Sequence, residues 1–149
     1  MKLFFPGSFD PFTIGHANLV DRALRIGCDV VVAIGVNEEK KPLFSVKERF
    51  EAISAYYKEN PHVTVIEYGG LTVDAALKNS CNAILRGIRS VTDYDKERNM
   101  ADINRSIADV ETVIMVSDPS VQHVSSSLVR ELHSFGRPVD GLVIDTFKI

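Results

Sequence analysis

The stretch GSFDPFTIGH, residues 7–16, decides the fold, because it joins a short buried strand to an amphipathic helix. The run Leu3–Phe5 before it has the apolar character of a buried strand, and residues 17–26 after it have the apolar period of a helix. Thr13 and His16 fall at the helix start, where the first turn leaves backbone N–H groups unpaired and carries the positive end of the helix dipole. A strand–loop–helix unit of this kind binds anions, and a histidine there is able to contact a phosphate. The stretch therefore predicts a nucleotide site.

Two common phosphate-binding loops do not fit this stretch. No GxGxxG follows the strand, and no GxxxxGK[ST] occurs that would indicate a P-loop. His16 taken alone is explained equally well by capping or packing at a helix start. The whole ten-residue string favours a functional interpretation.

Composition and charge describe one ordinary globular domain, which we expect to span residues 1–149. The chain has 45% hydrophobic and 25% charged residues, enough for a buried core. A net charge of −3 and a pI near 5.8 argue against a surface for nucleic acid or for an anionic membrane. No apolar run reaches the roughly 20 residues of a membrane span, and the N-terminal KLFF is too short for a signal sequence.

The two cysteines, Cys28 and Cys81, are isolated in the sequence. Neither has a CxxC partner or a cluster of histidine and cysteine neighbours that would indicate a metal site. We expect them to be buried thiols of a reduced, cytoplasmic protein, with a disulfide between them as the less favoured alternative.

Apolar strand-like runs alternate with helical periods along the chain. The run at residues 29–36, DVVVAIGV, is almost continuously apolar, as in a strand covered on both faces of a parallel sheet. Ser45-x-x-Glu48 has the spacing of a capping box and predicts a helix start. Further strands are expected at residues 63–68, 83–86 and 112–116, and further helices at 73–79, 93–108 and 126–135.

This alternation predicts an α/β fold, a Rossmann-like, doubly wound parallel sheet of five strands in the order 3-2-1-4-5 and in a single domain. Ligands bind such a sheet outside the carboxyl ends of the strands, at the point where the strand order reverses. The residues after Gly141 fit either a strand-like tail or a short terminal helix.

A polar cluster follows each expected strand, and the doubly wound sheet would bring all five to one edge. The clusters are residues 7–16, 37–43, 68–72, 86–89 and 117–130. Asp10 in the first cluster is expected to brace its own loop. Three histidines lie outside the first cluster. His62 and His133 fit surface positions, and His123 fits either a surface position or the binding site.

The basic residues of these clusters differ in how strongly they indicate a site. Arg86 ends an apolar strand, where a cation needs a partner, and phosphate suits the guanidinium fork. Arg89 either pairs with Asp93 on the surface or binds a ligand. Lys40 and Lys41 stand in a polar loop, where lysines are usually solvated charges and less often binding residues.

The serines Ser125, Ser126 and Ser127 open the last expected helix. One serine suffices as an N-cap, whereas three supply hydroxyl and N–H groups for an anion at the helix start. Both interpretations remain open from the residues alone.

Two strings resemble known signatures. GSFDPFTIGH resembles the T/HxGH signature of the nucleotidyltransferase superfamily, and VSSSLVR resembles its second signature, ISSTxxR. From about Leu3 to about Val143 the chain resembles the phosphopantetheine adenylyltransferase family. The resemblance rests on PGSFDPFTIGH, KKPLFSVKERF, AILRGIRSVTDYDKE, the Asn104-Arg105 pair and VSSSLVRE. Lys96 and Asp95 depart from it, since an aromatic residue and a glutamate are usual there.

The resemblance implies a cytoplasmic enzyme of coenzyme A biosynthesis that transfers AMP from ATP to 4′-phosphopantetheine, giving dephospho-coenzyme A and pyrophosphate. It further implies direct in-line attack with no covalent intermediate, Mg²⁺ delivered with ATP rather than by protein ligands, and a homohexamer. Two alternatives remain: another small nucleotidyltransferase with a different phosphorylated acceptor, and a non-catalytic nucleotide-binding protein on the same fold.

The resemblance also assigns site residues. His16 would be the catalytic residue, stabilising charge on the α-phosphate. The acceptor 4′-phosphopantetheine would be held by Ser8, Lys40, Thr72 and Arg86. ATP would be bound by Ser8, Phe9, His16, Gly87, Ile88, Arg89, Glu97, Val121, Gln122, His123, Val124, Ser125, Ser126 and Ser127.

Overall fold

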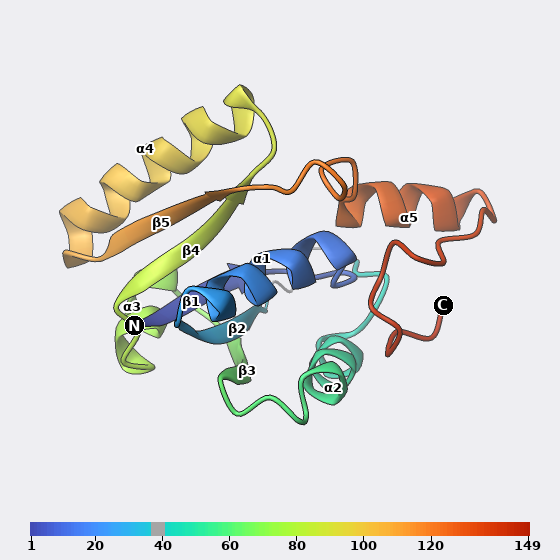
Figure 1. Cartoon of the computed structure of the whole chain (residues 1–149), viewed down its shortest axis with the longest axis horizontal. Coiled ribbons are helices and arrows are strands. Elements are labelled where there is room, and N and C mark those ends of the chain that lie inside the picture. The colour runs from blue at the N-terminus through green and yellow to red at the C-terminus, as the bar shows by residue number, and fades with distance from the viewer. Residues whose placement is uncertain (37–40) are drawn as a thin grey trace.

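Five parallel strands form the centre of the computed structural model, which describes residues 1–36 and 41–149 (Figure 1). Their order is β3-β2-β1-β4-β5, which confirms the predicted Rossmann-like doubly wound sheet. The strands are β1 (Lys2–Gly7), β2 (Asp29–Gly35), β3 (Val63–Tyr68), β4 (Ala83–Ile88) and β5 (Glu111–Val116).

Helices cover both faces of the sheet. Buried residues of α1 and α2 belong to one core cluster, whereas α3 and the end of α4 contribute to the other. The last helix, α5, lies beyond the carboxyl ends of the strands (Figure 1). The helices are α1 (Ile14–Arg25), α2 (Val46–Tyr56), α3 (Thr72–Lys78), α4 (Val91–Ala108) and α5 (Ser126–Ser134).

The apolar character of β1 follows from this double cover. Phe5 belongs to the core cluster under α1 and α2, and its neighbour Phe4 belongs to the cluster on the opposite face. Successive side chains of a strand alternate between faces, so a strand covered on both faces is apolar at every position.

Two capping boxes start helices near the carboxyl edge of the sheet. Ser45 Oγ accepts from Glu48 N at 3.2 Å, and Glu48 Oε2 accepts from Ser45 N at 2.7 Å, as the spacing predicts. Thr13 and His16 form the same reciprocal arrangement at the start of α1. His16 is thereby fixed relative to the helix start by the backbone itself.

The observed bounds differ from the predicted ones most clearly around β4. This strand extends to Ile88 rather than ending at Arg86, because its parallel pairing with β5 continues to Ile88 opposite Val116. Helix α4 begins at Val91 rather than Asp93, because Ser90 is its N-cap and accepts from Asp93 N at 3.1 Å.

The tail after Gly141 is neither of the two predicted structures. It makes a single antiparallel bridge, between Thr13 and Val143, and otherwise consists of turns and irregular chain. Ile144 and Phe147 are buried in the core cluster under α1 and α2, so side-chain packing orders the tail.

Both cysteines are free and buried, as predicted. Cys28 lies in one core cluster and Cys81 in the other, so the sheet separates them. Within residues 1–36 and 41–149, no helix has both the length and the apolar run needed to cross a membrane.

Candidate active site

Two cavities open at the carboxyl edge of the sheet and meet at β1. The first has a volume of about 460 Å³ and lies between the ends of β1, β4 and β5. The second has a volume of about 360 Å³ and lies between the ends of β1, β2 and β3, with α4 at its side. Both are lined by Gly7, Ser8 and Arg86, so a ligand in either one reaches the same strand end.

Most of the predicted ATP-site residues line the first cavity. Ile88, Gln122 and His123 do not line it, and Gln122 and His123 are exposed in the loop before α5. The predicted residues that line it are Ser8, Phe9, His16, Gly87, Arg89, Glu97, Val121, Val124, Ser125, Ser126 and Ser127, together with Arg86.

The His16 ring has one defined tautomer, because its Nδ1 atom accepts a hydrogen bond from Thr13 N at 3.0 Å. A neutral imidazole that accepts at Nδ1 carries its proton on Nε2. Thr13 Oγ1 lies 3.1 Å from the same Nδ1 atom and accepts from His16 N at 3.4 Å. The free ring edge is therefore an N–H donor.

Aromatic rings and nearby cations keep His16 neutral. Phe9 and Phe12 have ring centroids 5.1 and 5.2 Å from the imidazole, and Phe5 lies 6.2 Å away. Burial lowers the pKa of His16 from 6.5 to about 4, and the charges of Arg89 and then Arg86 contribute to the shift. Near neutral pH, His16 is an uncharged donor.

Close packing around the first loop requires glycine at two positions. A Cβ atom at Gly7 would lie 2.7 Å from the Phe9 ring, and one at Gly87 would lie 2.4 Å from a methyl group of Leu19. Phe9 itself has a φ of 49°, a left-handed conformation that turns the chain sharply after Ser8. The absence of a Cβ atom at both positions leaves room for Phe9 and Leu19, which line the first cavity.

Asp10 braces the first loop, as predicted, and does so through contacts with a distant segment of the chain. Its two carboxylate oxygens each accept a hydrogen bond at 2.8 Å, from Leu43 N and Phe44 N. Asp10 is buried, so it fixes the segment before α2 against the loop after β1. These partners are long-range backbone groups that local turn patterns do not reveal.

Two arginines support the same loop and were not predicted as site residues. Arg130 of α5 donates to Asp10 O at 2.8 Å and to Ser127 Oγ at 3.1 Å, and it lines the first cavity. Arg49 of α2 is buried and donates to Ser8 O. Arg130 is the last residue of the VSSSLVR string, so this motif could have identified it. The only sequence signal for Arg49 is its position on the core-facing side of the expected helix.

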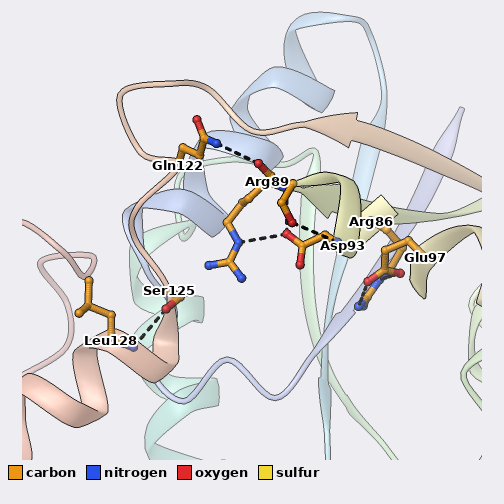
Figure 2. Close-up of polar contacts among 8 residues, drawn as sticks. Arg86, Arg89, Asp93, Glu97, Gln122, Ser125 and Leu128 are labelled. Atoms are coloured by element: carbon orange, nitrogen blue, oxygen red, sulfur yellow. Dashed lines mark hydrogen bonds and ion pairs between the residues drawn. The ribbon is translucent and has the colours of Figure 1, made fainter. Parts of the chain in front are cut away.

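The three serines before and within α5 have different roles in the fold. Ser125 is the N-cap and accepts from Leu128 N at 3.1 Å (Figure 2). Ser126 Oγ donates to Pro11 O at 2.8 Å, and so ties α5 to the loop after β1. One serine satisfies the cap, and all three line the first cavity.

Two arginines at the end of β4 each pair with a carboxylate of α4. Arg86 Nε and Nη2 donate to Glu97 Oε2 and Oε1 at 2.7 and 2.8 Å, and Arg86 Nη1 donates to Pro6 O at 3.1 Å. Arg89 Nε lies 3.4 Å from Asp93 Oδ2. Figure 2 shows both pairs side by side, with the Arg89 side chain extending toward the start of α5.

The β4–α4 turn is also tied to the loop before α5. Gln122 Nε2 donates to Arg89 O at 2.9 Å (Figure 2). Gln122 therefore fixes the backbone that carries Arg89, although its own side chain does not line the cavity.

Thr72, one of the predicted acceptor-binding residues, lines the second cavity but not the first. Thr72 Oγ1 lies 3.1 Å from Tyr68 OH, and both residues line this cavity. Met100 and Asn104 of α4 also line it and were not predicted, although they share a helix face with Glu97 by their spacing. The predicted acceptor residue Lys40 lies outside the residues that the structure describes.

The departures Asp95 and Lys96 are exposed on α4, and neither lines a cavity. In the described ranges 1–36 and 41–149, no group of three or more His, Cys, Asp or Glu side chains could hold a metal ion.

A doubly wound sheet with cavities at its carboxyl edge is typical of a nucleotide-binding enzyme, and comparison with known proteins shows that the class is the nucleotidyltransferases. The sequence model of the family described as Cytidylyltransferase-like matches residues 4–132. The chain is 49% identical over 145 residues to a phosphopantetheine adenylyltransferase of Porphyromonas gingivalis, covering 97% of this chain and 95% of that protein. Proteins with the same name are 40% identical in Bacteroides thetaiotaomicron, over 99% of this chain and 98% of that one, and 43% identical in Symbiobacterium thermophilum, over 96% and 89%.

This chain therefore belongs to the Cytidylyltransferase-like family and, within it, to the phosphopantetheine adenylyltransferases, which are nucleotidyltransferases of coenzyme A biosynthesis.

Proposed function

We propose that the chain binds ATP in the first cavity and 4′-phosphopantetheine in the second, and transfers AMP from one to the other. The observation that carries the proposal is the shared wall of the two cavities at Ser8 and Arg86. Two phosphorylated ligands that approach this wall from opposite sides bring their phosphates together.

The reaction needs no nucleophilic side chain. An oxygen of the acceptor phosphate attacks the α-phosphorus of ATP, a new P–O bond forms, and the bond to the β-phosphate oxygen breaks, which releases pyrophosphate. The task of the protein is to place two polyanions in line and to offset their charge. Neither Cys28 nor Cys81 lines a cavity, and both are buried in the core.

In this proposal His16 donates its Nε2–H to an oxygen of the α-phosphate. The bond from Thr13 N to Nδ1 holds the ring in the donating tautomer. A donor fixed in advance stabilises the charge that builds up on the transferred phosphate without reorganising during the reaction.

The remaining ATP contacts follow from the lining of the first cavity. Ser125–Ser127 lie at the start of α5, where free N–H groups and the helix dipole suit the β- and γ-phosphates. Arg89 and Arg130 line the same cavity and add positive charge to it. Phe9 and Val121 supply apolar lining for the adenosine.

On the acceptor side, Ser8 and Arg86 would contact the phosphate, and the second cavity would hold the pantetheine arm near Thr72. The polar groups of this cavity, Tyr68 and Asn104, suit the amides of that arm. Lys40 remains a proposed acceptor residue by family resemblance.

Magnesium would enter as part of the substrate MgATP. The carboxylates that line the first cavity, Asp93 and Glu97, are each paired with an arginine, so among the described residues they are poorly suited to serve as ligands of a resident ion. Both cysteines are free thiols, which supports action in the reducing cytoplasm.

A homo-oligomer, a hexamer by family resemblance, is also proposed. Helix α4 exposes the large apolar side chains of Met100, Ile103 and Ile107, which recur three and four residues apart and so share one face of the helix. A helix face of this kind is typical of an interface between copies of a chain. Light scattering after size-exclusion chromatography measures the assembly directly, and a monomer at micromolar concentration would contradict it.

The proposed reaction is tested by pyrophosphate release from ATP, with and without 4′-phosphopantetheine. We expect release to require the acceptor and to fall sharply when pantetheine lacking the phosphate replaces it. Release from CTP with the same acceptor, or from ATP with a different phosphorylated acceptor only, would favour the other nucleotidyltransferases. Binding of ATP without release would favour a nucleotide sensor.

A further inference from the structure

The Glu97 carboxylate occupies one edge of the Arg86 guanidinium, although the family resemblance places Glu97 among the ATP contacts. Each carboxylate oxygen of Glu97 accepts one hydrogen bond, at 2.7 Å from Arg86 Nε and at 2.8 Å from Arg86 Nη2 (Figure 2). Two parallel charge-assisted bonds of this kind define the plane and direction of the guanidinium.

The other contacts of Arg86 leave two donors for a ligand. A guanidinium has five N–H donors. Two point to Glu97, and one on Nη1 donates to Pro6 O at 3.1 Å. One N–H remains on each Nη atom, with no partner among the described residues. A phosphate monoester is able to accept both.

Arg86 lines both cavities, whereas Glu97 lines only the first. The Glu97 side chain is 16% exposed and that of Arg86 is 35% exposed, so the carboxylate lies deeper than the cation that it holds. Glu97 is therefore the less exposed partner of the pair, and it lies outside the lining of the second cavity, as a residue that supports Arg86 there would.

We propose that Glu97 is a positioning residue for the acceptor phosphate and acts through Arg86. It holds the guanidinium so that the two remaining N–H groups serve the ligand of the second cavity. This role rests on the proposed function, because the acceptor is the phosphorylated ligand of that cavity.

The same contact prevents a competing one. Arg86 also lines the cavity assigned to ATP, so a free arginine side chain could turn toward the triphosphate. Glu97 keeps Arg86 off the nucleotide, so its loss harms acceptor binding and leaves ATP binding the same or tighter. A direct ATP contact predicts the opposite pattern.

The neighbouring pair provides a contrast on the same helix. Asp93, one turn before Glu97 on α4, pairs with Arg89, which lines only the first cavity. The two carboxylates thus hold two arginines for the two ligands. Asp93→Asn should raise the KM for ATP more than the KM for the acceptor, because an amide cannot keep the ion pair with Arg89.

Steady-state kinetics of Glu97→Gln tests the proposal, with each substrate varied at saturation of the other. We expect the KM for 4′-phosphopantetheine to rise roughly ten- to a hundredfold, as for a lost charge-assisted bond, and the KM for ATP to change less than about twofold. Glu97→Asp keeps the charge on a shorter side chain and should recover part of the acceptor KM. Glu111→Gln breaks the exposed pair between Arg105 and Glu111 and serves as the matched control with unchanged kinetics.

The double variant shows whether Glu97 acts through Arg86. In an Arg86→Ala background, Glu97→Gln should add no further change to the acceptor KM. A further change of the full size seen in the wild-type background would overturn the proposal, as would a rise in the KM for ATP with an unchanged acceptor KM.

Equilibrium titration of the same variants with 4′-phosphopantetheine and with ATP separates this proposal from the reaction itself. A wild-type protein that releases no pyrophosphate would overturn the proposed function. The titrations need no turnover, so a selective loss of 4′-phosphopantetheine affinity in Glu97→Gln would still support the role of Glu97. Equal affinity in wild type and variant would overturn it.

Discussion

Acidification should destabilise the ligand-free protein through His16. The ring in an unfolded chain has a pKa near 6.5, whereas burial, aided by the charges of Arg89 and Arg86, lowers the pKa of His16 to about 4 in the folded protein. Between these values the unfolded chain binds a proton that the folded chain does not. The free energy of unfolding therefore falls as the pH falls from 6.5 toward 4.

The size of the effect follows from the difference between the two pKa values of His16. One pKa unit corresponds to about 1.4 kcal/mol, so the full difference is worth about 3 kcal/mol. A change from pH 7.5 to pH 5 covers roughly 1.5 of these units and should cost about 2 kcal/mol. This is an upper value, because the ring keeps partial exposure at the cavity, where solvent screens its charge.

Urea unfolding of the wild type and of His16→Asn at pH 7.5 and pH 5 measures this contribution. The asparagine oxygen is able to accept from Thr13 N in place of the imidazole Nδ1 atom, so the helix cap is retained. Other titrating groups are common to both proteins and cancel in the comparison. We expect the wild type to lose about 2 kcal/mol more than the variant on acidification.

Equal losses in the two proteins would refute the argument for a buried neutral histidine. An NMR titration of the His16 ring with a midpoint near 6.5 would refute it independently. Bound ATP should raise the midpoint, because a nearby phosphate favours the charged imidazole.

Four further predictions concern catalysis, binding and stability. His16→Ala should lower kcat about 10²–10³-fold with little change in the KM for ATP, because the donor matters most in the transition state; near-normal turnover would contradict this. Arg86→Lys should raise the KM for 4′-phosphopantetheine more than that for ATP, since an ammonium cannot keep both bonds to Glu97 and also hold a phosphate; similar changes in both constants would argue against it. Ser126→Pro removes one N–H at the first turn of α5, where proline is tolerated, and should weaken the binding of ATP but not of AMP in calorimetric titrations; an equal loss for both ligands would place the defect at the adenosine or the fold. Asp10→Asn should lower the free energy of unfolding in urea by roughly 1–3 kcal/mol, because one backbone N–H loses its carboxylate acceptor; an unchanged value would show that the two bonds contribute little.

The sheet was predictable because its residues carry a local signal. Continuous apolar runs mark the strands, and the Ser45-x-x-Glu48 spacing marks a helix start that the structure confirms. The end of β4 was not predictable in this way. Gly87 and Ile88 continue the ladder beyond the predicted end at Arg86, since backbone pairing with β5 does not depend on a local apolar run.

The site was predictable where one segment contains the whole signal. His16 and Thr13 stand three residues apart, so their reciprocal cap is local. The contacts of Asp10, of Arg49 and of Arg86 with Glu97 were harder to predict. Each of them joins segments that only the fold brings together. Polar side chains with buried backbone partners give no period along the chain, which is why the partners of Asp10 could not be predicted.

The charge of the site is opposite in sign to the net charge of the chain. The protein carries a net charge of −3, yet Arg86, Arg89 and Arg130 line the first cavity and Arg49 lies buried behind it. Arg86, Arg130 and Arg49 donate to a carboxylate or a carbonyl of the fold, and Arg89 forms an ion pair with Asp93, so each is held in place before any ligand arrives. Anion binding here therefore depends on a few oriented donors rather than on a broad positive surface. Such a site accepts a nucleotide phosphate at short range, while the negative net charge of the protein disfavours long polyanions such as nucleic acids.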